Sequence, residues 1–258
     1  MNKKITRIVL TVFFVVPVVY MIMWAFVESW PYNKMVPQLF TVRAWKSLLT
    51  NKDNLTIILK SIGISSSVAI LSIVFTYPAA KAIALYNFKF KSVFRVILFI
   101  PILLPVMSLA IGLHLNFLRL SLANKVPGVM IVHIFQCIPY CFLIIEPVIS
   151  SVGINYENQA RLLGANDVQT LIHINLPLYL PALLAAFFMS FIVSFSQYIV
   201  NFLIGGGLVN TFSTVIFPIL KEKDRHVSSV YSVVFLLICF AVYFVSNYFS
   251  RRMVENNE

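Results

Sequence analysis

Residues 129–149, VMIVHIFQCIPYCFLIIEPVI, decide which solvent this chain folds in. Glu146 is the one Asp, Glu, Lys or Arg in the stretch. About 20 mostly apolar residues at ~1.5 Å rise per residue are enough to cross roughly 30 Å of hydrocarbon. Because the run is continuously apolar rather than alternating, it predicts a membrane-spanning helix rather than a strand of a membrane barrel.

The composition of the whole chain also indicates lipid as the solvent. Of its 258 residues, 60% are hydrophobic and 11% are charged, whereas soluble domains are roughly 45–50% apolar and 25% charged. We therefore expect an all-α membrane protein with six transmembrane helices in a single transmembrane domain, residues 1–258. The predicted spans are approximately residues 8–27, 57–79, 96–117, 129–149, 178–204 and 227–249. Prolines inside them predict kinks rather than breaks, because neighbouring helices can satisfy the freed carbonyls.

The net charge of +11 does not indicate nucleic acid as a partner. The basic residues come singly or in short clusters between the apolar stretches, which is typical of loops beside anionic lipid headgroups. Compact clusters before the first and third predicted spans and after the sixth favour cytoplasmic termini, although Lys and Arg are equally numerous on the two sides. The three cysteines lie inside apolar stretches and predict neither a disulfide framework nor a metal site.

Residues 150–177 join the fourth and fifth predicted spans and form the longest of the predicted inner loops. Their pattern predicts a short helix over residues 156–163, a stop at Gly164, and a second short helix capped by Asn166 or Asp167. A Leu-Pro pair predicts a second stop before the next span. Two short helices at an angle would make a solid knob on the inner side.

This loop resembles the cytoplasmic coupling motif of ABC importer permeases, which reads Glu-Ala-Ala, three residues, Gly, nine residues, Ile, one residue, Leu-Pro. The positions in register are Ala160, Gly164, Ile174, Leu176 and Pro177. Asn158 stands at the Glu position and Gln159 at the first Ala position, and a glutamate lies one place earlier at Glu157. The resemblance implies an ATPase-coupling surface made of Glu157, Asn158, Gln159, Ala160, Gly164, Ala165, Ile174, Leu176 and Pro177.

The resemblance covers most of the chain. Residues 77–82, 98–105 and 189–218 are similar to the second, third and fifth spans of the same family. The chain looks most like the branch that imports spermidine or putrescine, ferric iron, thiamine or aminophosphonates. The residues that carry this likeness are Trp30-Pro31, Pro37 and Gly205-Gly206-Gly207.

The family likeness implies a permease subunit of an ATP-driven importer in the bacterial inner membrane, with both termini cytoplasmic. Such a subunit forms half of the translocation pathway for a small solute. The implied partners are two ATPase subunits, a second permease of the same or a different sequence, and an external substrate-binding protein. The chain has no Gly-x-x-x-x-Gly-Lys-Ser/Thr sequence, so we expect no enzymatic activity, cofactor or metal on it, and ATP with magnesium on the separate ATPase.

A polar face in the fifth predicted span is the candidate substrate pathway. Ser190, Ser194, Gln197 and Asn201 recur at helical spacing and would share one face of a continuous helix. Polar side chains in spans usually face the bundle interior or a water-filled cavity, so this face is expected to line the pathway. The same residue types also hold helices together, and this alternative stays open.

Two other functional classes compete with the permease. A secondary transporter or channel would work without ATP, but the paired intramembrane charges or symmetric interrupted helices typical of such proteins are not visible. An intramembrane enzyme would need a nucleophile with its base, or metal ligands at a suitable spacing.

Glu146 is an intramembrane acid and hence a functional candidate, although near the inner end of its span a structural or headgroup-facing role is also open.

Overall fold

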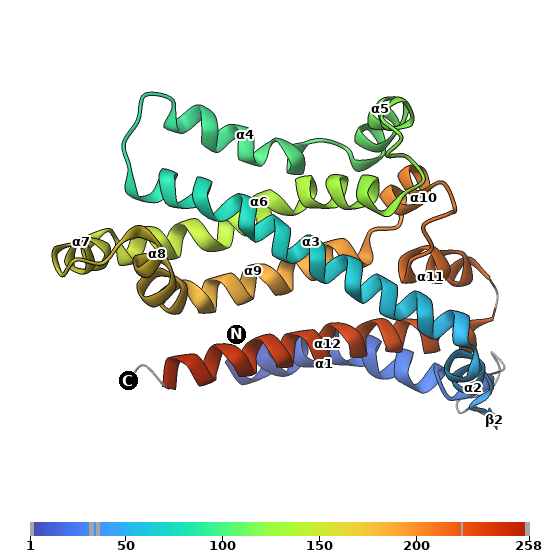
Figure 1. The fold of residues 1–258 in the computed structure, drawn as a ribbon. Helices are drawn as coiled ribbons and strands as arrows, with labels where there is room; N and C mark the ends of the chain where they lie inside the picture. The colour runs from blue at the N-terminus through green and yellow to red at the C-terminus, as the bar shows by residue number, and fades with distance from the viewer. Residues whose placement is uncertain (1–2, 31–33, 35–36, 223, 256–258) are drawn as a thin grey trace. The chain divides into compact units, whose positions relative to one another are not determined.

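A computed structural model describes residues 3–30, 34, 37–222 and 224–255. Within these ranges the chain is helical apart from loops and one short two-stranded hairpin (Figure 1). The elements in chain order are α1 (Lys3–Trp24), β1 (Val27–Ser29), β2 (Leu39–Phe40), α2 (Arg43–Thr50), α3 (Lys52–Leu85), α4 (Lys91–Leu103), α5 (Val106–Arg119), α6 (Val126–Val152), α7 (Asn155–Leu162), α8 (Asp167–Thr170), η1 (Leu171–Asn175, a π-helix), α9 (Leu176–Ser196), α10 (Ile199–Gly205), α11 (Phe212–Lys221) and α12 (Arg225–Glu255).

Four helices among the described residues are long and apolar enough to cross a membrane. They are Lys52–Leu85, Val126–Val152, Asp167–Ser196 and Arg225–Arg252, and they correspond to the second, fourth, fifth and sixth predicted spans. The bent pair α4 and α5 makes a fifth if it is counted as one span. The apolar part of α1, Val9–Trp24, is shorter. The prediction of an all-helical membrane protein is thus confirmed.

The third predicted span, residues 96–117, is broken rather than kinked. Helices α4 and α5 meet at an angle of 97°. Leu104 is extended, with φ −83° and ψ 129°, a conformation that Pro105 favours because it disfavours the helical conformation in the residue before it. The expectation that prolines only kink the spans is therefore wrong at Pro105, and α4 alone has 13 residues, about 20 Å of helix at ~1.5 Å per residue.

The expected Leu-Pro stop before the fifth span is also wrong, because the helix continues from Asp167 to Ser196. The π-helix η1 allows the helix to continue through the proline, because Leu176 donates its N–H to the Leu171 carbonyl, five residues back. This shift in the hydrogen-bond ladder lets Pro177, which has no N–H, lie within the first turn of α9.

The far end of the fifth predicted span breaks at Gln197, which is extended with φ −71° and ψ 104°. A separate helix, α10, follows it. The Gln197 carbonyl accepts a 2.7 Å hydrogen bond from Ser213 Oγ and another from Asn201 Nδ2. Because side chains satisfy the carbonyl that the helix leaves free, the break is tolerated in an apolar environment.

The chain forms two compact units, Met1–Leu59 with Thr214–Phe240, and Lys60–Ser213 with Ala241–Glu258. In the second unit, α6 packs against both α4 and α9 (Figure 1). One buried cluster joins α3, α6 and α9 through Ala80, Ile145 and Ala186, among others. Another joins α5, α6 and α10 through Ala110, Val132 and Ile204, among others.

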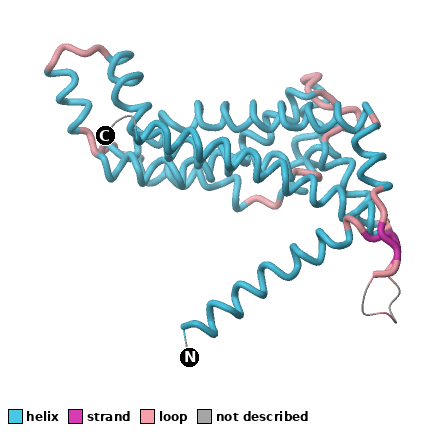
Figure 2. The backbone as a smooth tube through the Cα atoms, turned by 90° about the horizontal axis from the view of Figure 1, so that it is seen from below, coloured by secondary structure: helices cyan, strands magenta, loops and turns pink. Residues whose placement is uncertain are grey.

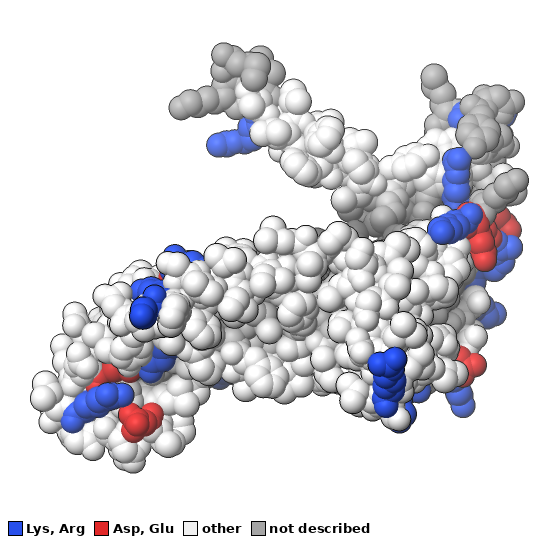
Figure 3. Space-filling model, turned by 90° about the horizontal axis from the view of Figure 1, so that it is seen from above, with Lys and Arg blue, Asp and Glu red and all other residues white. Residues whose placement is uncertain are grey.

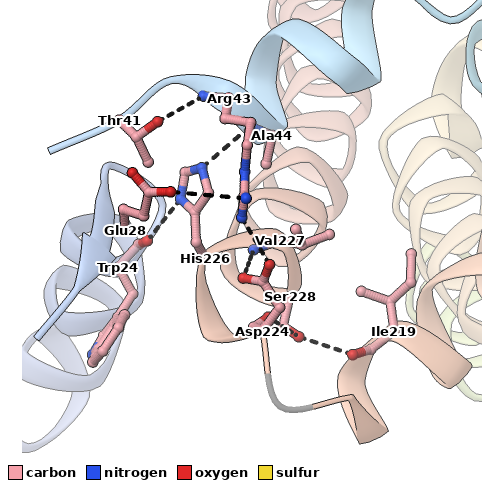
Figure 4. A network of polar contacts seen from close by, with 10 residues as sticks. All are labelled: Trp24, Glu28, Thr41, Arg43, Ala44, Ile219, Asp224, His226, Val227 and Ser228. Atoms are coloured by element: carbon pink, nitrogen blue, oxygen red, sulfur yellow. Dashed lines mark hydrogen bonds and ion pairs between the residues drawn. The ribbon is translucent and has the colours of Figure 1, made fainter. Parts of the chain in front are cut away.

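In the first unit, His226 connects three segments (Figure 4). The Ala44 N–H donates to His226 Nε2 at 3.2 Å, so this nitrogen carries no proton. In the neutral ring the proton then lies on Nδ1, which donates to the Trp24 carbonyl at 3.3 Å. The buried ring thus ties the start of α12 to the start of α2 and the end of α1, beside the short hairpin drawn as strands in Figure 2.

Charged side chains gather toward the helix ends on the face seen in Figure 3, and the surfaces between them are uncharged. Apolar side chains along the long helices are exposed, including Phe13, Ile70 and Phe244. Such faces would be costly in water but suit contact with lipid tails.

Candidate functional site

Helix α7 ends at a turn that only glycine adopts easily. Gly164 has φ +86°, in the left-handed region that side chains with a Cβ disfavour. Its N–H donates to the Arg161 carbonyl at 3.0 Å, and the N–H of Ala165 donates to the Ala160 carbonyl, also at 3.0 Å. This pair of hydrogen bonds is a Schellman motif, and it satisfies carbonyls that the helix end would otherwise leave free.

The second short helix, α8, begins with a complete capping box. Asn166 Oδ1 accepts from the Gln169 N–H at 2.8 Å, and Gln169 Oε1 accepts from the Asn166 N–H at 2.9 Å. Of the two predicted capping residues, Asn166 is therefore the cap. A 3.0 Å ion pair between Arg161 and Asp167 spans the turn. We call residues 155–175 (α7, α8 and η1 with their turn) the knob.

The outer face of the knob exposes four large apolar side chains. Leu162 and Leu163 are 87% and 89% exposed, and Val168 and Tyr156 are also exposed. Of these four residues, Leu163 and Tyr156 line a hollow of about 550 Å³. Of the residues predicted to couple to an ATPase, Gln159, Ala160, Gly164, Ala165 and Ile174 line this hollow. The sequence analysis did not predict a role for Leu162 and Leu163, although two adjacent leucines directly before the glycine that ends a helix are a recognisable pattern.

The remaining predicted coupling residues do not line the hollow and do not lie together. Asn158 and Leu176 are exposed and Pro177 is half-buried, all outside the lining of the hollow. Glu157 lies on the opposite side of α7, with 1% of its surface exposed. Its carboxylate lies 2.7 Å from Nζ of Lys81, near the end of α3. The structure thus turns Glu157, the residue before the motif's Glu position, inward.

Aromatic and amide side chains surround this ion pair. Tyr77, one turn before Lys81 on α3, and Tyr179 on α9 both interact electrostatically with the Glu157 carboxylate. The Asn175 side chain from η1 lies beside the Tyr77 hydroxyl. The Tyr77 and Tyr179 rings have centroids 6.3 Å apart. We call these five residues the inner cluster, and it joins α3, α7, η1 and α9.

The first two predicted pathway residues face other helices of this chain. Ser194 Oγ lies 2.8 Å from His133 Nδ1 on α6 and donates to Ser65 on α3 at 3.3 Å. Ser190 Oγ lies 3.0 Å from the Cys141 thiol of α6. Both serines are buried. These contacts favour the alternative of helix packing for Ser190 and Ser194.

The other two predicted pathway residues lie at the break after α9. Because α10 is a separate helix, the assumption of one continuous face through Asn201 is wrong. Asn201 is buried and donates to Thr211 Oγ1 and Ser213 Oγ, each at 3.0 Å. The Gln197 side chain is half-buried. Within the described ranges, no three His, Cys, Asp or Glu side chains come together in a way that could hold a metal ion.

Comparison with known proteins identifies the family. Residues 72–255 match the family described as "Binding-protein-dependent transport system inner membrane component". The chain belongs to this family. It is therefore the inner-membrane permease component of a binding-protein-dependent ABC transport system, as the coupling motif predicted, and not a secondary transporter or channel.

Two curated relatives illustrate the range of similar permeases. The spermidine/putrescine transport system permease protein PotC of Escherichia coli (strain K12) is 25% identical over 222 residues, covering 84% of this permease and 83% of PotC. The sulfate transport system permease protein CysT of Salmonella typhimurium is 30% identical over 134 residues, covering 49% of this permease and 48% of CysT. The first belongs to the branch that the sequence indicated.

Solved structures share the fold. A bacterial ABC transporter "involved in the import of the acidic polysaccharide alginate" aligns with a TM-score of 0.73 at 19% identity, covering 94% of each chain. The same kind of transporter "in complex with alginate pentasaccharide-bound periplasmic protein" aligns with a TM-score of 0.63 at 15% identity, covering 96% of this chain and 92% of that one. The permease itself is non-catalytic and binds no cofactor, and the ATPase is a separate subunit.

Proposed function

We propose that the knob docks a separate ATPase subunit, and that this permease forms half of the pathway for a small solute. The observation that carries the proposal is the pair of leucines, Leu162 and Leu163, left almost fully exposed at the end of α7, where Leu163 lines a hollow. Exposed apolar side chains around a depression are typical of a surface that a partner covers. The Schellman motif and the capping box give the knob the stiffness to transmit a push.

This assignment orients the chain in the membrane. With the knob on the cytoplasmic side, the end of α6 and the start of α9 are cytoplasmic. Counting α1 and the bent α4–α5 pair as spans then gives six crossings, with both termini in the cytoplasm. The basic residues in the first two turns of α1, around the start of α4 and near the end of α12 agree with this orientation.

The complete transporter is proposed to contain two ATPase subunits, a second permease and an external binding protein. Membership of a binding-protein-dependent ABC family implies an ATPase and a substrate-binding protein. The alginate transporter complex with its periplasmic protein is an example of the external partner. A hydrophobic and otherwise lipid-facing permease surface would supply the contact with the second permease.

Of the four predicted pathway residues, we propose that Gln197 faces the solute. It stands at the break between α9 and α10, where its side chain is partly accessible, while the other three are held by neighbours in the chain. A Gln197→Ala change should lower the apparent affinity for solute and leave the assembly of subunits intact. Ser196→Ala is the matched control, because Ser196 directly precedes Gln197, is exposed, and donates its hydroxyl to the Val193 carbonyl of the same helix.

The docking assignment is tested by changing the apolar surface of the knob. Leu162→Asp with Leu163→Asp should leave the permease inserted and folded, because both side chains are exposed. The ATPase subunit should no longer co-purify with this variant, and ATP-dependent uptake into proteoliposomes should fall at least tenfold. Leu208→Asp, at an exposed position in the loop after α10 and outside the spans, is the control. Normal co-purification and uptake with the double variant would reject the docking site.

A further inference from the structure

The Glu157–Lys81 ion pair differs from the other ion pairs of the same unit in its burial. The side chains of Glu157 and Lys81 are 1% and 21% exposed, against 17% and 47% for Glu146 and Arg95. Arg161 and Asp167, within the knob, are 51% and 87% exposed. Opposite charges attract more strongly where water is excluded, and separating a buried pair costs more than separating an exposed one.

The pair also joins parts of the chain that have different roles. Glu157 belongs to α7, whose outer face is the proposed docking surface. Lys81 lies in the last turn but one of α3, a helix of 34 residues that is long enough to cross the membrane. The two residues are far apart in the sequence, and the knob's covalent connections lead to α6 and α9 rather than to α3. The ion pair therefore provides a connection to α3 that the backbone does not.

Other polar side chains lie near the pair. Tyr77 and Tyr179 are close enough to the Glu157 carboxylate to interact with it electrostatically, and Asn175 lies beside Tyr77. A displacement of α7 must therefore either carry Lys81 and α3 with it or pull a buried carboxylate away from its counter-charge.

We propose that the Lys81–Glu157 ion pair transmits movement of the knob to α3, so that both residues are positioning residues for coupling ATP hydrolysis to transport. The proposal rests on the docking function of the knob. It assigns to Glu157 a role inside the permease rather than on the surface that meets the ATPase. It predicts that breaking the pair separates hydrolysis from transport while the subunits remain bound.

The test uses the complete transporter in proteoliposomes and measures the number of solute molecules moved for each ATP hydrolysed. Lys81→Glu and Glu157→Lys alone should each lower this ratio at least tenfold, with the ATPase subunits still co-purifying. The double exchange, Lys81→Glu with Glu157→Lys, should restore the ratio to within about threefold of wild type. The same exchange in the Arg95–Glu146 pair serves as the matched control, and its single variants should leave the ratio unchanged.

A second double variant, which carries no charge at either position, controls for misfolding caused by the charge reversals. Glu157→Gln with Lys81→Met keeps similar volumes, leaves no buried charge unpaired, and should still lower the ratio at least fivefold, because the attraction is gone. A wild-type ratio in this neutral variant, or in both single reversals, would overturn the proposed link while leaving the docking function standing. Solute uptake by the wild-type complex without ATP would overturn the docking function and the link together.

Discussion

Arg95 donates a 2.8 Å hydrogen bond to Glu146 and thereby joins α4 to α6. Glu146 is the one acidic residue in the apolar stretch of residues 129–149, and its ion pair with Arg95 explains how its charge is accommodated there. The carboxylate is mostly covered, while the guanidinium reaches an exposed position. This arrangement gives Glu146 a structural role, one of the alternatives that the sequence left open.

The unequal burial of the two partners predicts unequal effects of removing them. Arg95→Ala leaves a mostly covered carboxylate without its counter-charge and should cost about 1–3 kcal/mol of stability. Glu146→Ala leaves a cation that can reach water or headgroups, and should cost less than about 1 kcal/mol. Unfolding of the detergent-solubilised permease by increasing SDS measures both. A larger loss with Glu146→Ala would contradict the assigned geometry.

The turn that ends α10 predicts a steric effect at one glycine. Gly206 has φ +54°, and a Cβ placed there would collide with the side chain of Asn124. Gly206→Ala should therefore destabilise the permease by about 1–3 kcal/mol through crowding and backbone strain. Thermal unfolding should show no comparable loss for Gly63→Ala, since a Cβ at Gly63 meets nothing within 4 Å.

Removing the obstructing side chain checks this explanation directly. Asn124 itself has φ 62°, a conformation that glycine adopts without strain, and its N–H bond to the Ile204 carbonyl comes from the backbone. Asn124→Gly combined with Gly206→Ala should therefore recover part of the lost stability. Strictly additive losses would show that the collision is not the cause.

The break after α9 predicts a role for Asn201 in stability. Its amide holds Thr211 and Ser213 and also bonds the free Gln197 carbonyl. Asn201→Ala should lower stability by about 1–3 kcal/mol, because buried polar groups lose their partner. The change should also speed proteolysis at the α9–α10 junction. Ser196→Ala should stay within about 0.5 kcal/mol of wild type, and equal effects of the two changes would argue against Asn201 as the centre of this network.

The helices themselves could be predicted because apolar runs of sufficient length leave few other options in lipid. The breaks could not, for different reasons at each place. At Pro105 the local sequence permits either a kink or a break, and the packing of α5 against α10 accompanies the break. At Gln197 the break depends on Ser213, a distant side chain that satisfies the carbonyl. No pattern within the span itself reveals this partner.

The knob was predictable in outline and not in orientation. Gly164 and Asn166 mark the turn and the cap through local rules, and the structure has both as expected. Spacing alone could not show that Glu157 points inward, because its partner Lys81 lies on a different helix. The same limit applies to Ser190 and Ser194, whose polar spacing indicated a pathway but whose contacts are to α3 and α6.

Cross-linking at Leu163 tests the central claim, that the knob docks the ATPase, most directly. The native cysteines, Cys137, Cys141 and Cys239, are all buried, so an introduced thiol reacts with little background. Leu163→Cys, probed with short bifunctional thiol reagents in the assembled transporter, should cross-link to the ATPase subunit. Leu208→Cys, at an exposed position in the loop after α10, should not. Cross-linking of the ATPase at Leu208 and not at Leu163 would contradict the account.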